Sequence, residues 1–143
     1  MKRRISVRIQ VLDDDAAICR RLEGWLIEDG YAVECFTSAD EAMLAVVEKT
    51  FDIALVDLRL PEHDGGEVIS AILSSSPQTR VIAMAAFPKP DEAARALTAG
   101  ARNLLSKPIH RTDLLAAVAQ QVGEIGVSWR TEGTFNAAVG ARL

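Results

Sequence analysis

The strongest constraint in this sequence is one pattern that recurs along it: a short apolar run rich in β-forming residues, then a segment with helical periodicity. The apolar runs cover residues 5–12, 31–36, 52–56, 80–84 and 102–105. The helical patterns cover residues 15–29, 64–74, 90–99 and 112–122, and a further helix begins after Ser38. Such alternation predicts an α/β fold, a doubly wound, five-stranded parallel sheet with five helices on its two faces.

The third apolar run, residues 52–56, is expected to lie inside this sheet. After its first residue it is apolar without alternation, as in a strand that helices cover on both faces. Gln10 interrupts the apolar pattern of the first run. If the first strand is also central, the Gln10 amide must find hydrogen bonds within the core.

Several residues predict where the helices begin and end. Ser38 and Glu41 have the spacing of a capping box. Pro90 suits the first position of a helix, and Gly100 suits a left-handed C-cap. The buried stripe of the helix after Ser38 is predicted to comprise Met43, Val46 and Val47.

The chain of 143 residues fits one domain, which we assign to residues 1–122. Residues 123–143 lack a clear period, and we interpret them as a C-terminal extension or linker. Apolar residues make up 49% and charged residues 25%, which excludes a disordered or collagen-like chain. The net charge of −4 supplies no general basic field for nucleic acid or an anionic membrane.

The two cysteines, Cys19 and Cys35, are too few for a disulfide framework or a zinc cage. Their apolar sequence surroundings favour buried, reduced thiols. No apolar run reaches membrane-spanning length, and the first residues do not form the apolar core of a signal peptide. We therefore expect a cytoplasmic location.

Acidic residues follow the first and third apolar runs, and a lysine follows the fifth. They are Asp13 and Asp14, then Asp57, then Lys107. In a doubly wound sheet, sites form at the carboxyl ends of the strands. If the first and third strands are neighbours, the three carboxylates crowd one crevice. Two charges ~5 Å apart repel by roughly 3 kcal/mol at an effective dielectric constant of ~20.

A divalent cation would relieve this repulsion, and carboxylate oxygens with room for water suit Mg²⁺. Carboxylates, magnesium and a lysine together predict a phosphoryl-transfer site with an aspartate as the acceptor. Asp57 is the predicted nucleophile because it stands alone after the central strand. Asp13 and Asp14 are paired for metal binding, and Lys107 supplies a positive charge.

The motifs around these residues resemble those of the receiver domain of bacterial two-component response regulators. The resemblance covers about residues 5–122 and rests on several motifs in order. They are VLDDD at residues 11–15, ALVDLRLP at 54–61, Asp64-Gly65, Gly100-Ala101 and Lys107-Pro108.

This resemblance implies the strand order 2-1-3-4-5 and a role for each site residue. Asp57 would be the phosphorylated aspartate, and Lys107 would contact the phosphoryl oxygens. Asp13 and Asp14 would be the acidic pair that holds Mg²⁺, together with Asp57 and the main-chain carbonyl of Arg59.

The resemblance also implies a phosphoacceptor signalling domain. It would receive a phosphoryl group from a histidine kinase or phosphotransfer protein, in a Mg²⁺-dependent reaction, and pass the signal on by protein contact. Enzymatic activity would be limited to self-phosphorylation and dephosphorylation at Asp57. A homodimer is compatible with the resemblance, and no nucleic-acid or membrane contact is expected from this chain. The chain would be a stand-alone receiver or the front of a longer regulator.

Two positions depart from the family. Ala85 stands where the family usually has Thr or Ser, and Leu104 stands where it usually has Tyr or Phe. In the family, the hydroxyl moves to the phosphoryl group and the ring turns inward behind it. A hydrogen bond to a charged group is worth ~1.5–3 kcal/mol. Without it, phosphorylation loses roughly ten- to hundredfold of its influence on the conformational equilibrium. We expect this chain to signal weakly or by another route.

Three other functions compete with this interpretation. A pseudo-receiver would be a constitutive protein-binding module with weak or no phosphorylation-driven switching, and Ala85 with Leu104 favours it. A phosphatase of the haloacid-dehalogenase type would use Asp13 and Asp15, but Ala17 stands where that family has Thr or Val. A flavodoxin-like carrier would need a phosphate-binding loop after the first strand, where three aspartates repel phosphate.

Overall fold

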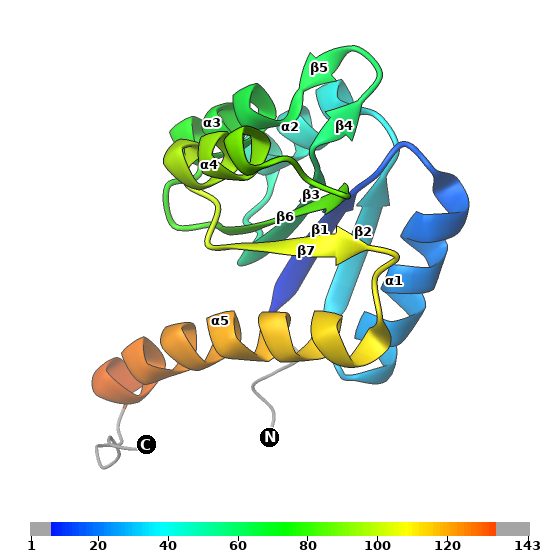
Figure 1. Ribbon diagram of the computed structural model, residues 1–143. Helices are drawn as coiled ribbons and strands as arrows, with labels where there is room; N and C mark the ends of the chain where they lie inside the picture. Colours follow the sequence, from blue (N-terminus) through cyan, green and yellow to red (C-terminus); the bar gives the residue numbers. More distant parts are fainter. Residues whose placement is uncertain (1–6, 134–143) are drawn as a thin grey trace.

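The structure, a computed structural model, describes the backbone of residues 7–133 and the side chains of residues 7–125. Its core is a five-stranded parallel sheet in the order β2-β1-β3-β6-β7 (Figure 1). The strands are β1 (Arg8–Leu12), β2 (Ala32–Phe36), β3 (Ile53–Asp57), β6 (Arg80–Ala86) and β7 (Asn103–Lys107). Counted along this sheet, the order is 2-1-3-4-5, which confirms the predicted topology.

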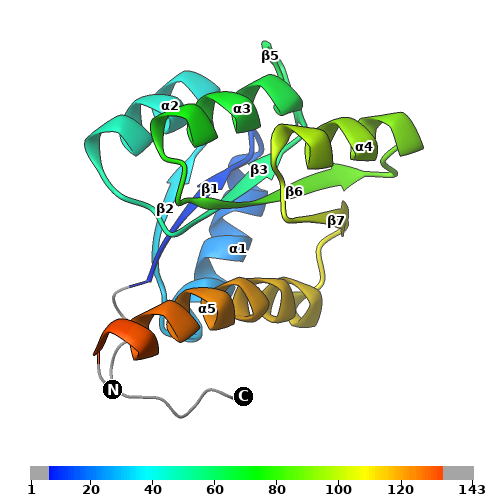
Figure 2. The same ribbon diagram turned by 90° about the vertical axis from the view of Figure 1, so that its left-hand side faces the viewer.

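Five helices cover the two faces of the sheet, as Figures 1 and 2 show. One face carries α1 (Ala16–Glu28) and α5 (Arg111–Gly133). The other carries α2 (Ala39–Glu48), α3 (Gly65–Ser75) and α4 (Pro90–Ala99). The five residues of β3 are buried between these layers, which explains their apolar run. No helix within residues 7–133 has both the length and the apolar character needed to span a bilayer.

Gln10 lies fully buried in β1. Its side-chain Nε2 donates a hydrogen bond to the carbonyl of Ala42 in α2, over 2.9 Å. Its Oε1 has no hydrogen-bond partner among the described residues. The expected core hydrogen bonds of this amide are therefore half satisfied.

The helix ends predicted at Ser38, Pro90 and Gly100 are confirmed. Oγ of Ser38 accepts a hydrogen bond from the main-chain N of Glu41 at the start of α2, over 3.3 Å. Pro90 is the first residue of α4. Gly100 follows the end of α4 with φ of 120°, a conformation that side-chain-bearing residues rarely adopt.

The predicted buried stripe of α2 is wrong at one position. Val47 is 67% exposed, whereas Val46 is buried. The other buried residues of α2 are Ala39, Ala42 and Ala45. Val46 lies four residues after Ala42 and seven after Ala39, so it lies on the same side of the helix. Val47 projects about 100° away from Val46.

α5 continues past Val122, where the sequence pattern predicts its end. Residues 123–133, the first part of the predicted extension, are thus helical, and residues 134–143 lie outside the described part of the chain. Nη1 of Arg80, at the start of β6, lies 2.6 Å from Oε1 of Glu124. This ion pair ties the continued helix to the amino end of β6.

A further structure that the sequence pattern did not predict lies between β3 and α3. There β4 (Arg59–Leu60) and β5 (His63–Asp64) form a short antiparallel pair. The pair folds the segment after Asp57 into a compact hairpin. This fixes Arg59 directly beside the carboxyl end of β3.

Candidate functional site

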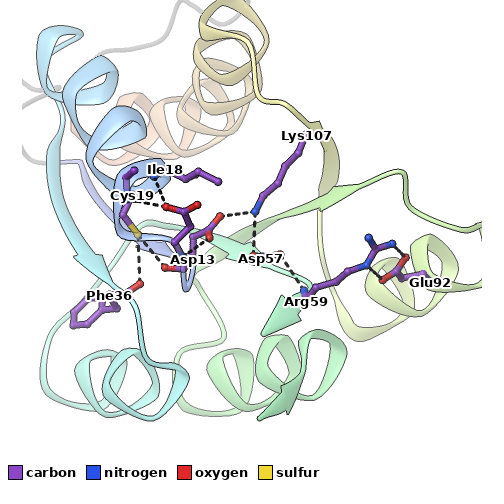
Figure 3. A network of polar contacts seen from close by, with 10 residues as sticks. Asp13, Ile18, Cys19, Phe36, Asp57, Arg59, Glu92 and Lys107 are labelled. Carbon is purple, nitrogen blue, oxygen red and sulfur yellow. Dashed lines mark hydrogen bonds and ion pairs between the residues drawn. The ribbon is translucent and has the colours of Figure 1, made fainter. Parts of the chain in front are cut away.

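The carboxyl ends of the strands bring Asp13, Asp57 and Lys107 together, as Figure 3 shows. Asp13 follows β1, and Asp57 ends the neighbouring strand β3. Lys107 ends β7, and its side chain reaches both carboxylates past the end of β6. Its Nζ lies 2.6 Å from Oδ2 of Asp13 and 3.1 Å from Oδ2 of Asp57. One ammonium group thus bridges two carboxylates from different strands.

Asp14 joins this cluster from its exposed side. Asp13, Asp14 and Asp57 each offer a carboxylate oxygen, and these oxygens lie within 4.8 Å of one another. The side chains of Asp13 and Asp57 are 0% and 5% exposed. The cluster is therefore buried on one side and open to solvent at Asp14.

Arg59 contacts the site through its main chain and points its side chain away from it (Figure 3). Its N–H donates a hydrogen bond to Oδ1 of Asp57, over 3.0 Å. Its guanidinium pairs with both carboxylate oxygens of Glu92 in α4, over 2.8 and 3.1 Å. No feature of the sequence connects Glu92 with Arg59, so sequence analysis missed Glu92. The predicted metal-ligand role of the Arg59 carbonyl stays a prediction.

Burial raises the pKa of Asp57 above its ordinary value, and the negative charge of Asp13 raises it further. The hydrogen bonds from Arg59 N–H and Lys107 oppose this rise. For Lys107, burial lowers the pKa, but the hydrogen bonds and charges of Asp13 and Asp57 outweigh burial and leave the pKa raised. The ammonium therefore stays protonated at neutral pH.

The donor set of this cluster fits a magnesium ion. It offers only carboxylate oxygens, and three carboxylates face one ammonium. The excess negative charge and the open side at Asp14 suit a divalent cation that keeps several waters. The stability of the cluster should then depend on the cation.

In a chelator, the Asp57→Asn variant should be more stable than the unchanged chain at pH 7, by about 1 kcal/mol. The raised pKa of Asp57 means that the fold disfavours its ionised form. The stabilisation that Asp57 contributes in its protonated form is therefore fully present below the unfolded-state pKa, and it is lost as the pH rises through the folded-state pKa. Urea unfolding at pH 7 and at acidic pH measures the free energy of unfolding of both chains. The advantage of Asp57→Asn over the unchanged chain should be smaller at acidic pH than at pH 7. A variant less stable than the unchanged chain at both pH values would contradict this expectation.

The two positions that depart from the family lie in β6 and β7 and carry no polar side-chain atom. Ala85 in β6 is buried, one residue after Met84, which pairs with Asp57 across the sheet. Leu104 in β7 is half-buried and pairs with Ala83. Neither side chain can donate a hydrogen bond to a group bound at Asp57.

Cys19 and Cys35 are free thiols. Sγ of Cys19 donates a hydrogen bond to the carbonyl of Asp13, over 3.2 Å, and Sγ of Cys35 donates to the carbonyl of Cys19, over 3.3 Å. Cys19 is buried and Cys35 is partly buried. The predicted burial is thus found for Cys19 and only in part for Cys35, and both thiols hydrogen-bond to main-chain carbonyls next to Asp13.

Comparison with known proteins shows which family the chain belongs to. The family model for the response regulator receiver domain matches residues 9–119. The chain is 35% identical over 115 residues to the alginate biosynthesis transcriptional regulatory protein AlgB of Pseudomonas aeruginosa, covering 80% of this chain and 26% of that protein. It is 35% identical over 114 residues to the acid tolerance regulatory protein ActR of Rhizobium meliloti, covering 80% and 59%. The chain thus spans less than two thirds of either relative.

Solved structures agree with this family. A response regulator receiver domain protein (CheY-like) from Methanospirillum hungatei superposes with a TM-score of 0.82 at 28% identity, covering 85% of this chain and 98% of that chain. A response regulator protein from Burkholderia pseudomallei with a phosphorylated aspartic acid, calcium ion and citrate has a TM-score of 0.75 at 26% identity, covering 92% and 77%. The chain therefore belongs to the receiver domains of two-component response regulators, whose general function is phosphorylation on an aspartate.

Proposed function

We propose that Asp57 accepts a phosphoryl group from the phosphohistidine of a partner kinase or phosphotransfer protein. The single observation that carries this proposal is the bridge that Lys107 makes between Asp13 and Asp57. A carboxylate oxygen of Asp57 attacks phosphorus and the P–N bond breaks. The donor imidazole, which carries a proton on its other ring nitrogen, leaves as a neutral ring. Water later attacks phosphorus, which releases inorganic phosphate and restores the carboxylate.

Lys107 and Arg59 prepare Asp57 for this transfer. The N–H of Arg59 holds Oδ1 of Asp57, so the carboxylate has a fixed orientation. The Lys107 ammonium lies next to Oδ2, where it can neutralise charge on the incoming phosphoryl oxygens. Both groups are in place before the donor arrives, so little reorganisation accompanies the transfer.

Asp13, Asp14, Asp57 and the Arg59 carbonyl would hold a magnesium ion in this site. Their oxygen donors and their excess negative charge support this assignment. When bound, the ion supplies further charge neutralisation on the transferred phosphoryl group. The structure of the Burkholderia pseudomallei response regulator contains both a phosphorylated aspartic acid and a calcium ion, which supports a proposal that combines an acyl phosphate with a divalent cation.

Family membership supports the remaining parts of the proposal. The domain would act in the cytoplasm and pass its signal on by protein contact. The relatives AlgB and ActR are regulatory proteins longer than the matched segment. We propose that the receiver controls an output of that regulatory kind, in the same protein or in a partner.

Mass spectrometry after incubation with acetyl phosphate and Mg²⁺ tests the proposal. We expect a labile adduct with the mass of one phosphoryl group on Asp57, absent with a chelator and absent in Asp57→Asn. The variant Asp91→Asn, which changes an exposed aspartate in α4, should form the adduct like the unchanged chain. An adduct on Asp13 with turnover of phosphomonoesters would instead indicate a phosphatase. Magnesium binding without any adduct would indicate a pseudo-receiver.

A further inference from the structure

Arg59 is bonded to the phosphoacceptor through its main chain and to α4 through its side chain (Figure 3). Its N–H donates to Oδ1 of Asp57, over 3.0 Å. Its Nη2 and Nε donate to the two carboxylate oxygens of Glu92, over 2.8 and 3.1 Å, which is a two-pronged, geometrically specific pair. Nη2 also lies 3.4 Å from the carbonyl oxygen of Phe87. One residue thus links Asp57 with the loop between β6 and α4.

The groups that Arg59 holds determine how α4 begins. Oε1 of Glu92 also accepts a hydrogen bond from the main-chain N of Lys89, over 3.2 Å, and so caps the first turn of α4. Phe87 has a φ of 45°, in the left-handed region that aromatic residues rarely adopt. The loop therefore has a conformation that its own sequence disfavours and that the Arg59 contacts support.

α4 buries few of its own side chains. Of its residues only Ala96 is buried, and Leu97 is 53% exposed. A helix with so few buried apolar contacts moves at low free-energy cost. The contacts of Glu92 with Arg59 and with the main chain of Lys89 therefore help to fix the N-terminal end of α4.

The usual residues for transmitting a signal from Asp57 to this region are missing. Ala85 has no hydroxyl group and Leu104 has no aromatic ring. Lys107 is already bonded to Asp13 and Asp57. Arg59 lies in β4, two residues after Asp57, and its side chain is 46% exposed, so this cation has room to change its partner.

Phosphorylation changes the charge beside Arg59. An ionised Asp57 carries one negative charge, whereas its acyl phosphate carries about two. A guanidinium forms the same forked hydrogen bonds with a phosphoryl group as with a carboxylate, and the dianion attracts it more strongly. Resting on the proposed function, we infer that the Arg59 guanidinium leaves Glu92 for the phosphoryl group on Asp57, and that this exchange releases the β6–α4 loop and the first turn of α4.

Proton–nitrogen NMR spectra with Mg²⁺ and beryllofluoride, a stable mimic of the phosphoryl group, test this exchange. In the unchanged chain, beryllofluoride should shift the amide signals of residues 87–92 as well as those around Asp57. Glu92→Gln keeps the shape of the side chain but removes its charge. In this variant the signals of residues 87–92 should already be displaced toward their beryllofluoride positions. Their remaining response should be smaller by about threefold or more.

Asp91→Asn is the matched control, because Asp91 lies in the same turn and pairs with Arg95 one turn further along, over 3.3 Å. It should respond like the unchanged chain. Arg59→Gln keeps the main-chain bond to Asp57, so the signals around Asp57 should still shift while those of residues 87–92 lose most of their response. A response of residues 87–92 in Glu92→Gln equal to that of the unchanged chain overturns the inference alone. The absence of any beryllofluoride response in the unchanged chain overturns the proposed function and the inference with it.

Discussion

Replacing Lys107 by Met is expected to slow the phosphorylation of Asp57 by acetyl phosphate about 10- to 100-fold at saturating Mg²⁺. Met keeps most of the length of the side chain but removes the ammonium, which lies 3.1 Å from Oδ2 of Asp57. The charge that develops on the transferred phosphoryl oxygens then loses a partly buried, prepositioned cation. The rate of appearance of the adduct, followed by mass spectrometry, measures this loss.

Lys49→Met is the matched control for this variant. Lys49 also lies 2.6 Å from a carboxylate, that of Glu34, but both side chains are about two-fifths exposed. Such a pair contributes about 1 kcal/mol or less, and its loss should leave the phosphorylation rate unchanged. Removing the cation from the buried pair costs about 3 kcal/mol, so circular dichroism must show that Lys107→Met is folded. A folded variant with an unchanged rate would make Lys107 a structural partner of the aspartates only.

The convergence of Asp13, Asp57 and Lys107 could be predicted because it follows from a general property of parallel sheets. The carboxyl ends of all strands lie at one edge, so residues that follow the strands meet there whenever the strands are close. The apolar runs themselves are too similar in composition to specify which strands are neighbours. That information came from the family motifs, which place the first strand beside the third.

The pair between Arg59 and Glu92 could not be predicted in the same way. The two residues are separated by 33 positions, and their contact depends on the hairpin after β3 and on the conformation of the β6–α4 loop. The left-handed φ of Phe87 has no signature in the sequence, since the conformation is typical of glycine. The Arg59–Glu92 pair depends on loop conformations that tertiary contacts determine. It therefore cannot be predicted from which residues follow the strands.

The end of α5 shows how tertiary contacts override local preference. Gly123 and Gly126 each disfavour a helix by about 1 kcal/mol relative to alanine, and they suggest an end near Val122. The helix continues because Arg80 pairs with Glu124 and because Ile125 is partly buried. Neither contact is visible from the local sequence.

Gly65→Ala is expected to cause a large loss of stability, about 3 kcal/mol in urea unfolding. Gly65 is the first residue of α3, and a Cβ at this position would lie 2.5 Å from Cα and 2.7 Å from the carbonyl oxygen of Leu58. These are backbone atoms, so a side-chain rotation cannot relieve the clash. Leu58 directly follows Asp57, and its N–H donates to the carbonyl of Met84 over 2.9 Å. Displacing Leu58 should also shift Asp57 and weaken Mg²⁺ binding, which a magnesium titration followed by NMR would detect.

The neighbouring substitution Gly66→Ala separates this clash from a change in helix preference. A Cβ at Gly66 would meet only Oδ2 of Asp64, at 3.5 Å, which is an ordinary contact. Because alanine is favoured over glycine in helices, this variant should match the unchanged chain or gain up to about 1 kcal/mol. Equal losses in the two variants would mean that the first turn of α3 tolerates no side chain for reasons unrelated to Leu58. A loss confined to Gly65→Ala would show that the close approach of α3 to Leu58 holds the phosphoacceptor in position.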